Sequence, residues 1–301
     1  MCLKKNTLSC FVLLALLTNA IFLAAQNRPK KQFRLPDVLK EVSGLHYAAP
    51  DSLWWLNDSG DSPTLYLTNG VGEIKAKIRL PIRNVDWEDL TGDDKGRLYI
   101  GDFGNNRSLR QDLKIYTYEP ASGNLDSMAF SYPDQSHFNG TSATSSFDVE
   151  GFFWHQDSLH LFSKSKLPKS NYLTKHYVLS QQGRNQMAEL RDSIVLKKRA
   201  VTAAAIDPTT GRVALLAYYY KVVLGFWPVS KASVYFFEDY PAGYFLRAKP
   251  SRKKASCLLA LQYESLDFVD DKYLYIASEQ TKFFKPRVKR LRMPRRQRGK
   301  G

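Results

Sequence analysis

The sequence is organised around a short motif at residues 84–106, which consists of an acidic stretch, a turn and an apolar run. We call this motif the hairpin phrase. The acidic stretch is Asp86-Trp87-Glu88-Asp89-Leu90, the turn spans 91–96, and Leu98-Tyr99-Ile100 leads into Gly101-Asp102-Phe103. Apolar alternation on both sides of a Gly/Asp-rich turn is typical of a β-hairpin. The phrase returns along the chain, and a recurring hairpin limits the fold to an array of small sheets.

Four further copies of the phrase can be found. Residues 40–58, 148–163 and 263–279 each carry a Glu, an apolar residue close behind it, a turn and an apolar strand. A degenerate copy at 201–219 has Thr202 or Ala203 where the others have Glu. The anchors at 41, 88, 150, about 202 and 264 are separated by 47, 62, about 52 and about 62 residues. Four short strands with their turns need roughly 40–50 residues, which is the period of a propeller blade.

We therefore predict an all-β fold, a β-propeller with five blades. Six blades remain open if a 62-residue interval contains a decayed copy, and an irregular β-sandwich with coincidental hairpins is the other alternative. The last copy is followed by one further strand, near Val288. We expect a strand at 32–35 to complete that blade, because pairing of the N- and C-terminal strands would remove an exposed sheet edge.

The two ends of the chain differ from the rest. Lys4 and Lys5 precede an apolar run from 11 to 25, and Leu23-Ala24-Ala25 is typical of a signal-peptidase site. A retained membrane anchor is the alternative, although the run is short for a span. We predict a signal peptide at 1–25, one propeller domain at 26–292 and a basic disordered tail at 293–301, because the tail lacks apolar residues.

Cysteine usage bears on the compartment. Cleavage after Ala25 removes Cys2 and Cys10 and leaves Cys257, which cannot form an internal disulfide. A buried apolar role fits its neighbours Leu258 and Leu259. We expect an exported monomer of a bacterial envelope, periplasmic or at the cell surface.

The formal net charge of +15 is concentrated near the end of the chain, where ten Lys and Arg residues fall between 282 and 300. Aromatic residues do not interleave with the basic ones of the tail, and an exported protein rarely meets nucleic acid, so specific nucleic-acid binding is not expected. Contact of the tail with an anionic surface, or no role, remains open.

The acidic anchors predict a cation site. Glu41, Glu88, Glu150 and Glu264 hold similar places in their copies, so a ring would bring them to one height around one axis. Converging carboxylates raise one another's pKa, and a divalent cation relieves the repulsion. Oxygen ligands suit calcium or magnesium, with Asp102 as a further ligand candidate. In the alternative interpretation, each Glu accepts backbone N–H groups of the next blade and holds the ring together. No Gly-rich phosphate loop is present, so we expect no organic cofactor.

A second polar set follows the second strand of each phrase. The segments 57–61 and 102–106 are longer and more acidic than a hairpin turn needs. Ser163-Lys164 and Ser278-Glu279 fill the same slot in later copies. The ligand-binding candidates are Asn57, Asp58, Asp61, Trp87 and Asn105. Aromatic residues near this acidic rim (Trp54, Trp55, Trp87, Phe103 and Trp154) fit sugar or polymer binding as well as catalysis.

Several phrases resemble a known group of proteins. EVSGL at 41–45, DWEDL at 86–90, LYIGDFGNN at 98–106, DVEGF at 148–152 and LYIASE at 274–279 are similar to exported bacterial β-propellers related to the SdiA-regulated and esterase-like-activity-of-phytase families. The resemblance implies a propeller, an envelope location and calcium. Gluconolactonase-type propellers place Glu, Asn and Asp around a divalent ion, and Glu41, Asn57 and Asp102 can be matched to them, although the lactonase signature is absent.

Three functions are compatible with these sequence features. The first is a propeller that binds a small molecule, a glycan or an envelope protein at an acidic, aromatic channel mouth. The second is a metal-dependent hydrolase of phosphoester or lactone substrates, in which a carboxylate-held cation activates water. The third is an envelope assembly protein that uses its basic tail. No G-x-S-x-G phrase or metal-spaced His pair assigns catalytic residues, which favours binding.

Overall fold

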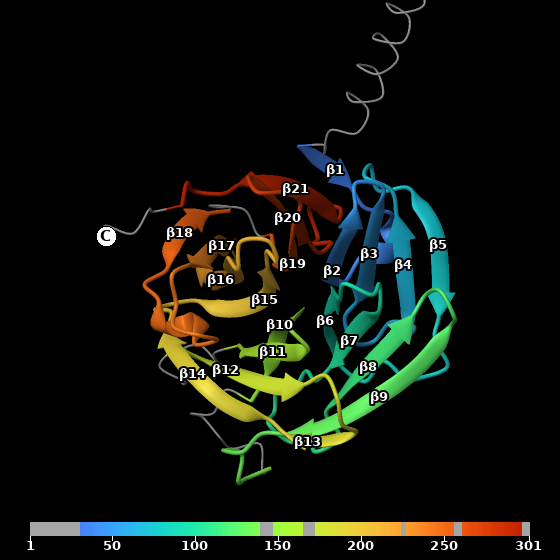
Figure 1. Cartoon of the computed structure of the whole chain (residues 1–301). Helices are drawn as coiled ribbons and strands as arrows, with labels where there is room; N and C mark the ends of the chain where they lie inside the picture. The colour runs from blue at the N-terminus through green and yellow to red at the C-terminus, as the bar shows by residue number, and fades with distance from the viewer. Residues whose placement is uncertain (1–30, 139–146, 165–171, 224–226, 256–260, 297–301) are drawn as a thin grey trace, which may run out of the picture.

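Five sheets stand around one axis and form a closed ring in the computed structural model (Figure 1). The structure describes residues 31–138, 147–164, 172–223, 227–255 and 261–296. The expected signal peptide and Cys257 lie outside these residues. Within them, no helix has the length and apolar character needed to cross a membrane.

Each blade contains four antiparallel strands, and the sheet of blade two has a fifth strand at its edge. Blade one contains β2 (Val42–Ala49), β3 (Ser52–Asn57), β4 (Thr64–Thr68) and β5 (Ile74–Arg79). Blade two contains β6 (Trp87–Gly92), β7 (Leu98–Asp102), β8 (Lys114–Glu119) and β9 (Asn124–Ser131). Blade three contains β10 (Val149–His155), β11 (Ser158–Ser163), β12 (Leu173–Ser180) and β14 (Glu189–Val195). Blade four contains β15 (Ala200–Ile206), β16 (Val213–Val223), β17 (Trp227–Phe237) and β18 (Ser251–Lys254).

Blade five closes the ring. It contains β19 (Tyr263–Phe268), β20 (Tyr273–Ser278), β21 (Arg287–Arg292) and β1 (Gln32–Arg34), so its outer strand comes from the other end of the chain. Phe33 pairs with Val288, and its ring meets Tyr275 edge-on at 5.6 Å between centroids. The five-bladed propeller and its closure by terminal strands are confirmed. The extra strand β13 (Asn185–Met187) pairs in parallel with β9, and two short 3-10 turns cover Asp37–Leu39 and Phe245–Arg247.

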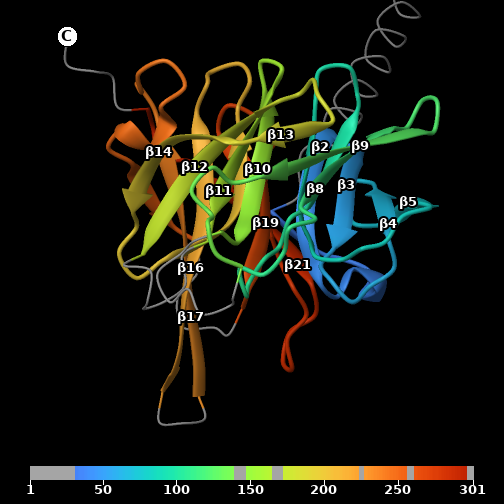
Figure 2. The ribbon, with the colours of Figure 1, turned by 90° about the horizontal axis from the view of Figure 1, so that it is seen from below.

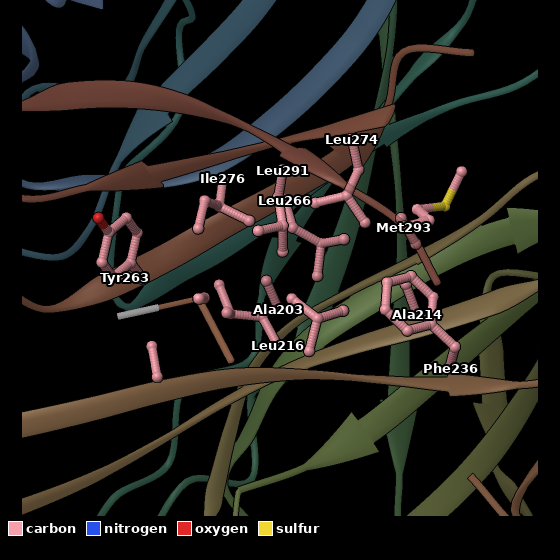
Figure 3. Close-up of a cluster of buried hydrophobic side chains, with 14 of the residues drawn as sticks. Ala203, Ala214, Leu216, Phe236, Tyr263, Leu266, Leu274, Ile276, Leu291 and Met293 are labelled. Carbon is pink, nitrogen blue, oxygen red and sulfur yellow. The ribbon is translucent and has the colours of Figure 1, made fainter. Parts of the chain in front are cut away.

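The core consists of apolar clusters between neighbouring blades. Figure 3 shows the cluster between blades four and five, in which Leu216 and Phe236 of one sheet face Leu266 and Leu274 of the other. Met293 belongs to this cluster and is 7% exposed. This packed side chain lies one residue beyond the expected domain end at 292, and the domain bounds stay a prediction. An apolar side chain beyond the last strand extends the packed region, and residues 297–301 lie outside the described part.

The register of the innermost strands corrects one anchor. Each of these strands carries an irregularity near its start, between Val42 and Gly44 in blade one and between Trp87 and Asp89 in blade two. The residues at this bulge are Ser43, Glu88, Glu150, Thr202 and Glu264. Glu41 lies two positions earlier, so its predicted equivalence to Glu88 was wrong. The apolar residue two places after the bulge faces the core, and Gly44-Leu45 therefore matches Gly151-Phe152.

The ring has two faces. We call one the carboxylate face, because acidic side chains gather on it, and the other the opposite face. The innermost strands start at the carboxylate face, and the hairpins between first and second strands turn at the opposite face. Strand β16 continues through Val223, six residues beyond Ala217, the position level with Asn57 and Ser163. At roughly 3.3 Å per residue this is about 20 Å. Figure 2 shows the resulting β16–β17 hairpin projecting from one face of the ring.

Candidate cation and ligand site

Seven carboxylates from four blades gather at the carboxylate face. The bulges supply Glu88, Glu150 and Glu264, the segments just before β6 and β10 supply Asp86 and Asp148, and the residues after β3 and β20 supply Asp58 and Glu279. Because each position recurs with the blade, the ring symmetry brings residues far apart in sequence to one place. We call this set the carboxylate belt.

Neighbouring carboxylates of the belt lie close enough together to share a metal ion. Three groups each have ligand oxygens within 4.8 Å of one another, namely Asp58-Glu264-Glu279, Asp58-Asp86-Glu88 and Glu88-Asp148-Glu150. The groups share Asp58 and Glu88, so they link across the channel mouth. Only carboxylate oxygens contribute to them, and this donor set is the one that calcium and magnesium prefer.

Lys164 lies at one end of the belt. Its ammonium contacts Glu150 Oε1, and its side chain is 20% exposed. Burial disfavours the charged ammonium, but Glu150, Tyr218 and Glu264 outweigh that effect and raise the pKa of Lys164 well above its usual value. Lys164 follows β11 as Asp58 follows β3 and Glu279 follows β20, so the sequence position that supplies acids in two blades supplies a base in a third.

Burial and mutual repulsion oppose ionisation of the belt carboxylates. Burial, and then Glu150, raises the pKa of Glu88 well above its ordinary range, and burial likewise raises that of Glu150. Burial is also the largest cause that raises the pKa of Asp58 to about 6 and that of Glu279 to about 10, with Glu264 adding to both. Close carboxylates in a buried place must bind protons or a cation.

Asp102, a predicted metal ligand, belongs to none of these groups. It pairs with Arg110 Nη2 at 2.9 Å and accepts the backbone N–H of Asp86 at 3.1 Å. Burial raises its pKa although Arg110 opposes the shift. Asp102 therefore holds the segment that presents Asp86 rather than facing the belt itself.

The loop after β7 positions two of the belt carboxylates and leaves room for them. The backbone N–H of Asn105 donates to Asp148 Oδ1 at 2.7 Å, so this predicted ligand residue positions a belt carboxylate through its main chain. A Cβ at Gly104 would overlap Glu88 Oε1 and Asp86 Oδ2. The absence of a side chain at 104 is therefore what lets two carboxylates approach each other.

The other predicted residues have supporting places. Asn57 donates from Nδ2 to Val38 O at 2.7 Å and to Asp61 Oδ2 at 2.5 Å, which anchors the turn carrying Asp58. The carbonyl of Glu41 accepts the N–H of Asp58 at 2.9 Å, and its carboxylate helps to raise the pKa of Glu279. Glu41 is thus at the edge of the belt, outside its three ligand groups.

The aromatic residues do not line the acidic mouth. Trp87 is fully buried in the core between blades one and two and offers no ring surface to a ligand. Trp54, Trp55 and Phe103 are also buried, and Trp154 lines a cavity at the opposite face. An aromatic platform for sugar rings beside the carboxylates is therefore absent at these predicted positions.

Other side chains hold the blades together. Asp89, fully buried, accepts the N–H of Phe152 at 3.0 Å on Oδ2, which links blades two and three. Ser43 donates to the carbonyl of Glu88, and Thr202 Oγ1 donates to Tyr263 O at 2.9 Å. The blade-to-blade contacts that the alternative interpretation gave to the glutamates are thus made by their neighbours and by the bulge residues of blades one and four.

Several solved structures are similar to this chain. MPT-4, a mannose phosphorylase from Leishmania mexicana, has a TM-score of 0.50 at 12% identity, over 92% of this chain and 93% of that one. A gluconolactonase from Xanthomonas campestris has a TM-score of 0.44 at 10% identity, over 85% and 88% of the chains. Virginiamycin B lyase from Staphylococcus aureus has a TM-score of 0.44 at 8% identity, over 88% of each.

At 12% identity the likeness to the mannose phosphorylase concerns the fold alone. No protein-family model matches the sequence, and no curated protein matches it either. The resemblance to the two propeller families therefore stays a hypothesis. Fold and site together define a five-bladed β-propeller with a carboxylate-lined channel mouth.

Proposed function

We propose that this protein is an exported propeller that binds a divalent cation in the carboxylate belt and, through that cation, an oxygen-bearing ligand. The observation that carries the proposal is the overlap of three carboxylate groups, contributed by four blades, at one end of the channel. The signal peptide predicted at 1–25 supports export.

The residues present fit calcium better than magnesium. Calcium takes six to eight oxygens in flexible geometry, whereas magnesium demands a near-ideal octahedron and keeps several waters. The belt offers many carboxylate oxygens from elements that approach from different sides. The raised pKa of Asp58 and of Glu279 and the space left by Gly104 also support a cation at this place.

The chemistry of the mouth suggests the class of ligand. A bound cation would attract carboxylate, phosphate or hydroxyl oxygens, and Lys164 would add a fixed positive charge at one end of the belt. A small molecule, a glycan or an envelope protein that bears such groups would fit. The aromatic residues predicted for this mouth do not line it, so they give no support to binding through sugar faces.

A metal-dependent hydrolase of phosphoesters or lactones is the second candidate. Lys164 and Tyr218 interact electrostatically with each other and with Glu150, which indicates that they share one edge of the belt. A cationic group and a phenol at the edge of a cation site are groups that can stabilise a developing oxyanion. The cation would polarise the ester or activate water.

Calcium binding tests the proposal. Protein stripped with a chelator is titrated with calcium and then with magnesium, and the heat of binding and the unfolding temperature are measured. We expect calcium to raise the unfolding temperature by several degrees, and Glu88→Gln to remove most of this rise. Asp126→Asn, at an exposed site in the same blade, should keep it. No binding of either ion at millimolar concentration would contradict the proposal.

A substrate screen then separates the two candidates. Phosphoesters and lactones are offered to the calcium-loaded protein. Turnover that disappears with Glu88→Gln would support the hydrolase. Cation binding without turnover supports a binding protein, in which the ion holds the ligand.

A further inference from the structure

A cavity of about 420 Å³ lies at the opposite face of the ring, away from the carboxylate belt. Residues of all five blades line it, and its walls include the apolar side chains of Leu45, Leu90, Ile206 and Leu266. This volume is within the usual range of small-ligand sites, and a concave, mostly apolar lining is typical of them. The cavity therefore has the size and the lining of a binding site for a small molecule.

The charged residues of this cavity are acidic, although the chain has a formal net charge of +15. None of its described lining residues is Lys or Arg. Six aspartates from blades two, four and five line it, namely Asp93, Asp94, Asp207, Asp267, Asp270 and Asp271. A hollow lined by charges of one sign concentrates the field and attracts ions of the opposite sign. The cavity thus favours a cationic ligand.

Two of the aspartates are engaged in contacts within the protein. Asp93 pairs with Arg97 Nη2 at 2.6 Å. Asp267 accepts the N–H of Tyr47 at 2.7 Å and lies 3.4 Å from His46 Nδ1, so it connects blade five to blade one. The charge of these two carboxylates is therefore partly balanced before any ligand arrives.

Two more aspartates lie close to basic side chains. Asp207 and Asp271 also line a neighbouring hollow, to which Arg292 and Arg296 contribute. Asp271 pairs with Lys272 at 3.7 Å as well, although a pair between exposed groups contributes little. On this side, between blades four and five, the negative charge of the mouth is reduced.

Asp94 and Asp270 retain an accessible charge. Both are exposed, in the turns of blades two and five, and these two blades flank blade one. Asp270 Oδ1 accepts the backbone N–H of Lys272 at 2.8 Å and that of Tyr273 at 2.7 Å. Burial, and then Asp270 and Asp267, raises the pKa of the Tyr47 phenol in blade one to about 12. The phenol thus stays neutral and experiences the negative charge of this side of the mouth.

The aspartates are spread too widely for a single metal ion. The described groups of three whose ligand oxygens lie within 4.8 Å of one another all belong to the belt, and none includes a residue of this cavity. A divalent cation needs several oxygens around one point. Separated carboxylates instead suit a molecule whose positive charges are themselves separated, and an apolar wall between them suits a chain of methylene groups.

We propose that this cavity binds a small linear diamine or polyamine, with ammonium groups at Asp94 and Asp270 and methylene groups along the apolar wall. Each ammonium would donate charge-assisted hydrogen bonds to a carboxylate, and such bonds are stronger than those between neutral groups. Trp154 and Phe268 add aromatic surface to the lining, and an ammonium is attracted to an aromatic face within about 6 Å. The two ends of the channel would then take different cations.

Calorimetric titration of the full chain with hexamethylenediamine tests the proposal. Hexylamine, which lacks one ammonium, and hexanediol, which lacks both, are the matched probes. We expect hexylamine to bind at least tenfold more weakly than the diamine, and hexanediol to show no binding. Equal binding of the diamine and hexanediol, or no binding of the diamine at millimolar concentration, would overturn the proposal.

Variants then place the diamine in the molecule. The double variant Asp94→Asn with Asp270→Asn should bind it at least tenfold more weakly, and Asn at 270 keeps the Oδ1 that accepts the N–H groups of the turn. Asp126→Asn, exposed in blade two, and Glu88→Gln, in the belt, should each bind it within twofold of the unaltered protein. An affinity that falls with Glu88→Gln and not with the double variant would assign the diamine to the belt and overturn the proposal.

Discussion

Lys164 contacts the carboxylate of Glu150 within the channel mouth, where its ammonium faces the carboxylate belt. Removing one partner of a mostly buried ion pair leaves the other uncompensated, and this destabilises a protein more than the pair stabilised it. We predict that Lys164→Met lowers the free energy of unfolding by about 3 kcal/mol in the presence of chelator. Denaturant titration measures this loss.

The same variant should bind calcium more tightly, by roughly tenfold, because a competing positive charge is gone. Lys95→Met, in an exposed turn of blade two, is the control for loss of one charge and should change neither quantity. If Lys164→Met alters neither stability nor calcium affinity, Lys164 is not part of the site.

Gly104 tests the shape of the belt. A Cβ there would overlap both Glu88 Oε1 and Asp86 Oδ2, so Gly104→Ala must push one carboxylate aside. We expect the affinity for calcium to fall at least tenfold while the far-ultraviolet circular dichroism spectrum stays the same. Asn106→Ala, two residues further in the same loop, should retain the affinity. Undiminished calcium binding by Gly104→Ala would mean that the ion does not lie between Asp86 and Glu88.

Phe33 tests the closure of the ring. Its side chain is 7% exposed and packs with Tyr275 of blade five, although its strand lies at the other end of the sequence. We expect Phe33→Ala to cost about 3 kcal/mol of unfolding free energy, the usual effect of removing a buried phenyl ring. Gln32→Ala, exposed on the same strand, should cost less than about 0.5 kcal/mol. Equal effects of the two changes would show that β1 does not close the last blade in solution.

Much of this architecture can be predicted from the recurring hairpin phrase. The phrase indicates five blades because each copy contains its own turn and its own apolar strand, and the strand at Phe33 is required to complete the last blade. Register was harder to predict. Glu41 was aligned with the other glutamates because of its charge. The buried residue Leu45 instead determines the register, and it places Ser43 at the bulge.

The membership of the site could be predicted only in part. Glu88, Glu150, Glu264 and Asp58 lie in the belt, but Asp86, Asp148, Glu279 and Lys164 were missed as site residues. Asp86 and Asp148 precede their strands, and their positions depend on contacts such as that of Asn105 with Asp148 across 43 residues. Glu279 and Lys164 were recognised in the slot directly after a second strand, but that slot was read as a turn in their copies and neither residue was taken as a candidate.

A chain of polar contacts in blade three predicts acid sensitivity. His160 Nδ1 lies 2.9 Å from His176 Nε2, and His176 Nδ1 lies 2.8 Å from Asp192 Oδ1. Burial lowers the pKa of both histidines, that of His160 most strongly. Below about pH 6.5 the unfolded chain therefore binds protons that the folded protein does not, and stability falls as the pH falls.

Comparison of the unaltered protein with His160→Phe isolates this effect. The variant removes one titrating group at a site already surrounded by Phe153 and Phe245. We predict that the loss of stability below pH 6.5 becomes shallower by up to about 1.4 kcal/mol per pH unit. Unfolding free energies at pH 5 to 8, with calcium fixed, measure the slope. Parallel curves for the two proteins would contradict the assignment.

The central claim is that the carboxylate belt holds a divalent cation, and the position of the ion in a crystal tests it most directly. Crystals grown with chelator are soaked in manganese or calcium, and anomalous scattering locates the bound ion. We predict a peak within about 2.0–2.6 Å of oxygens from at least one of the three groups that meet at Asp58 and Glu88. A fully soaked crystal with no peak at the channel mouth, and with Lys164 as the only cation beside Glu150, would contradict it.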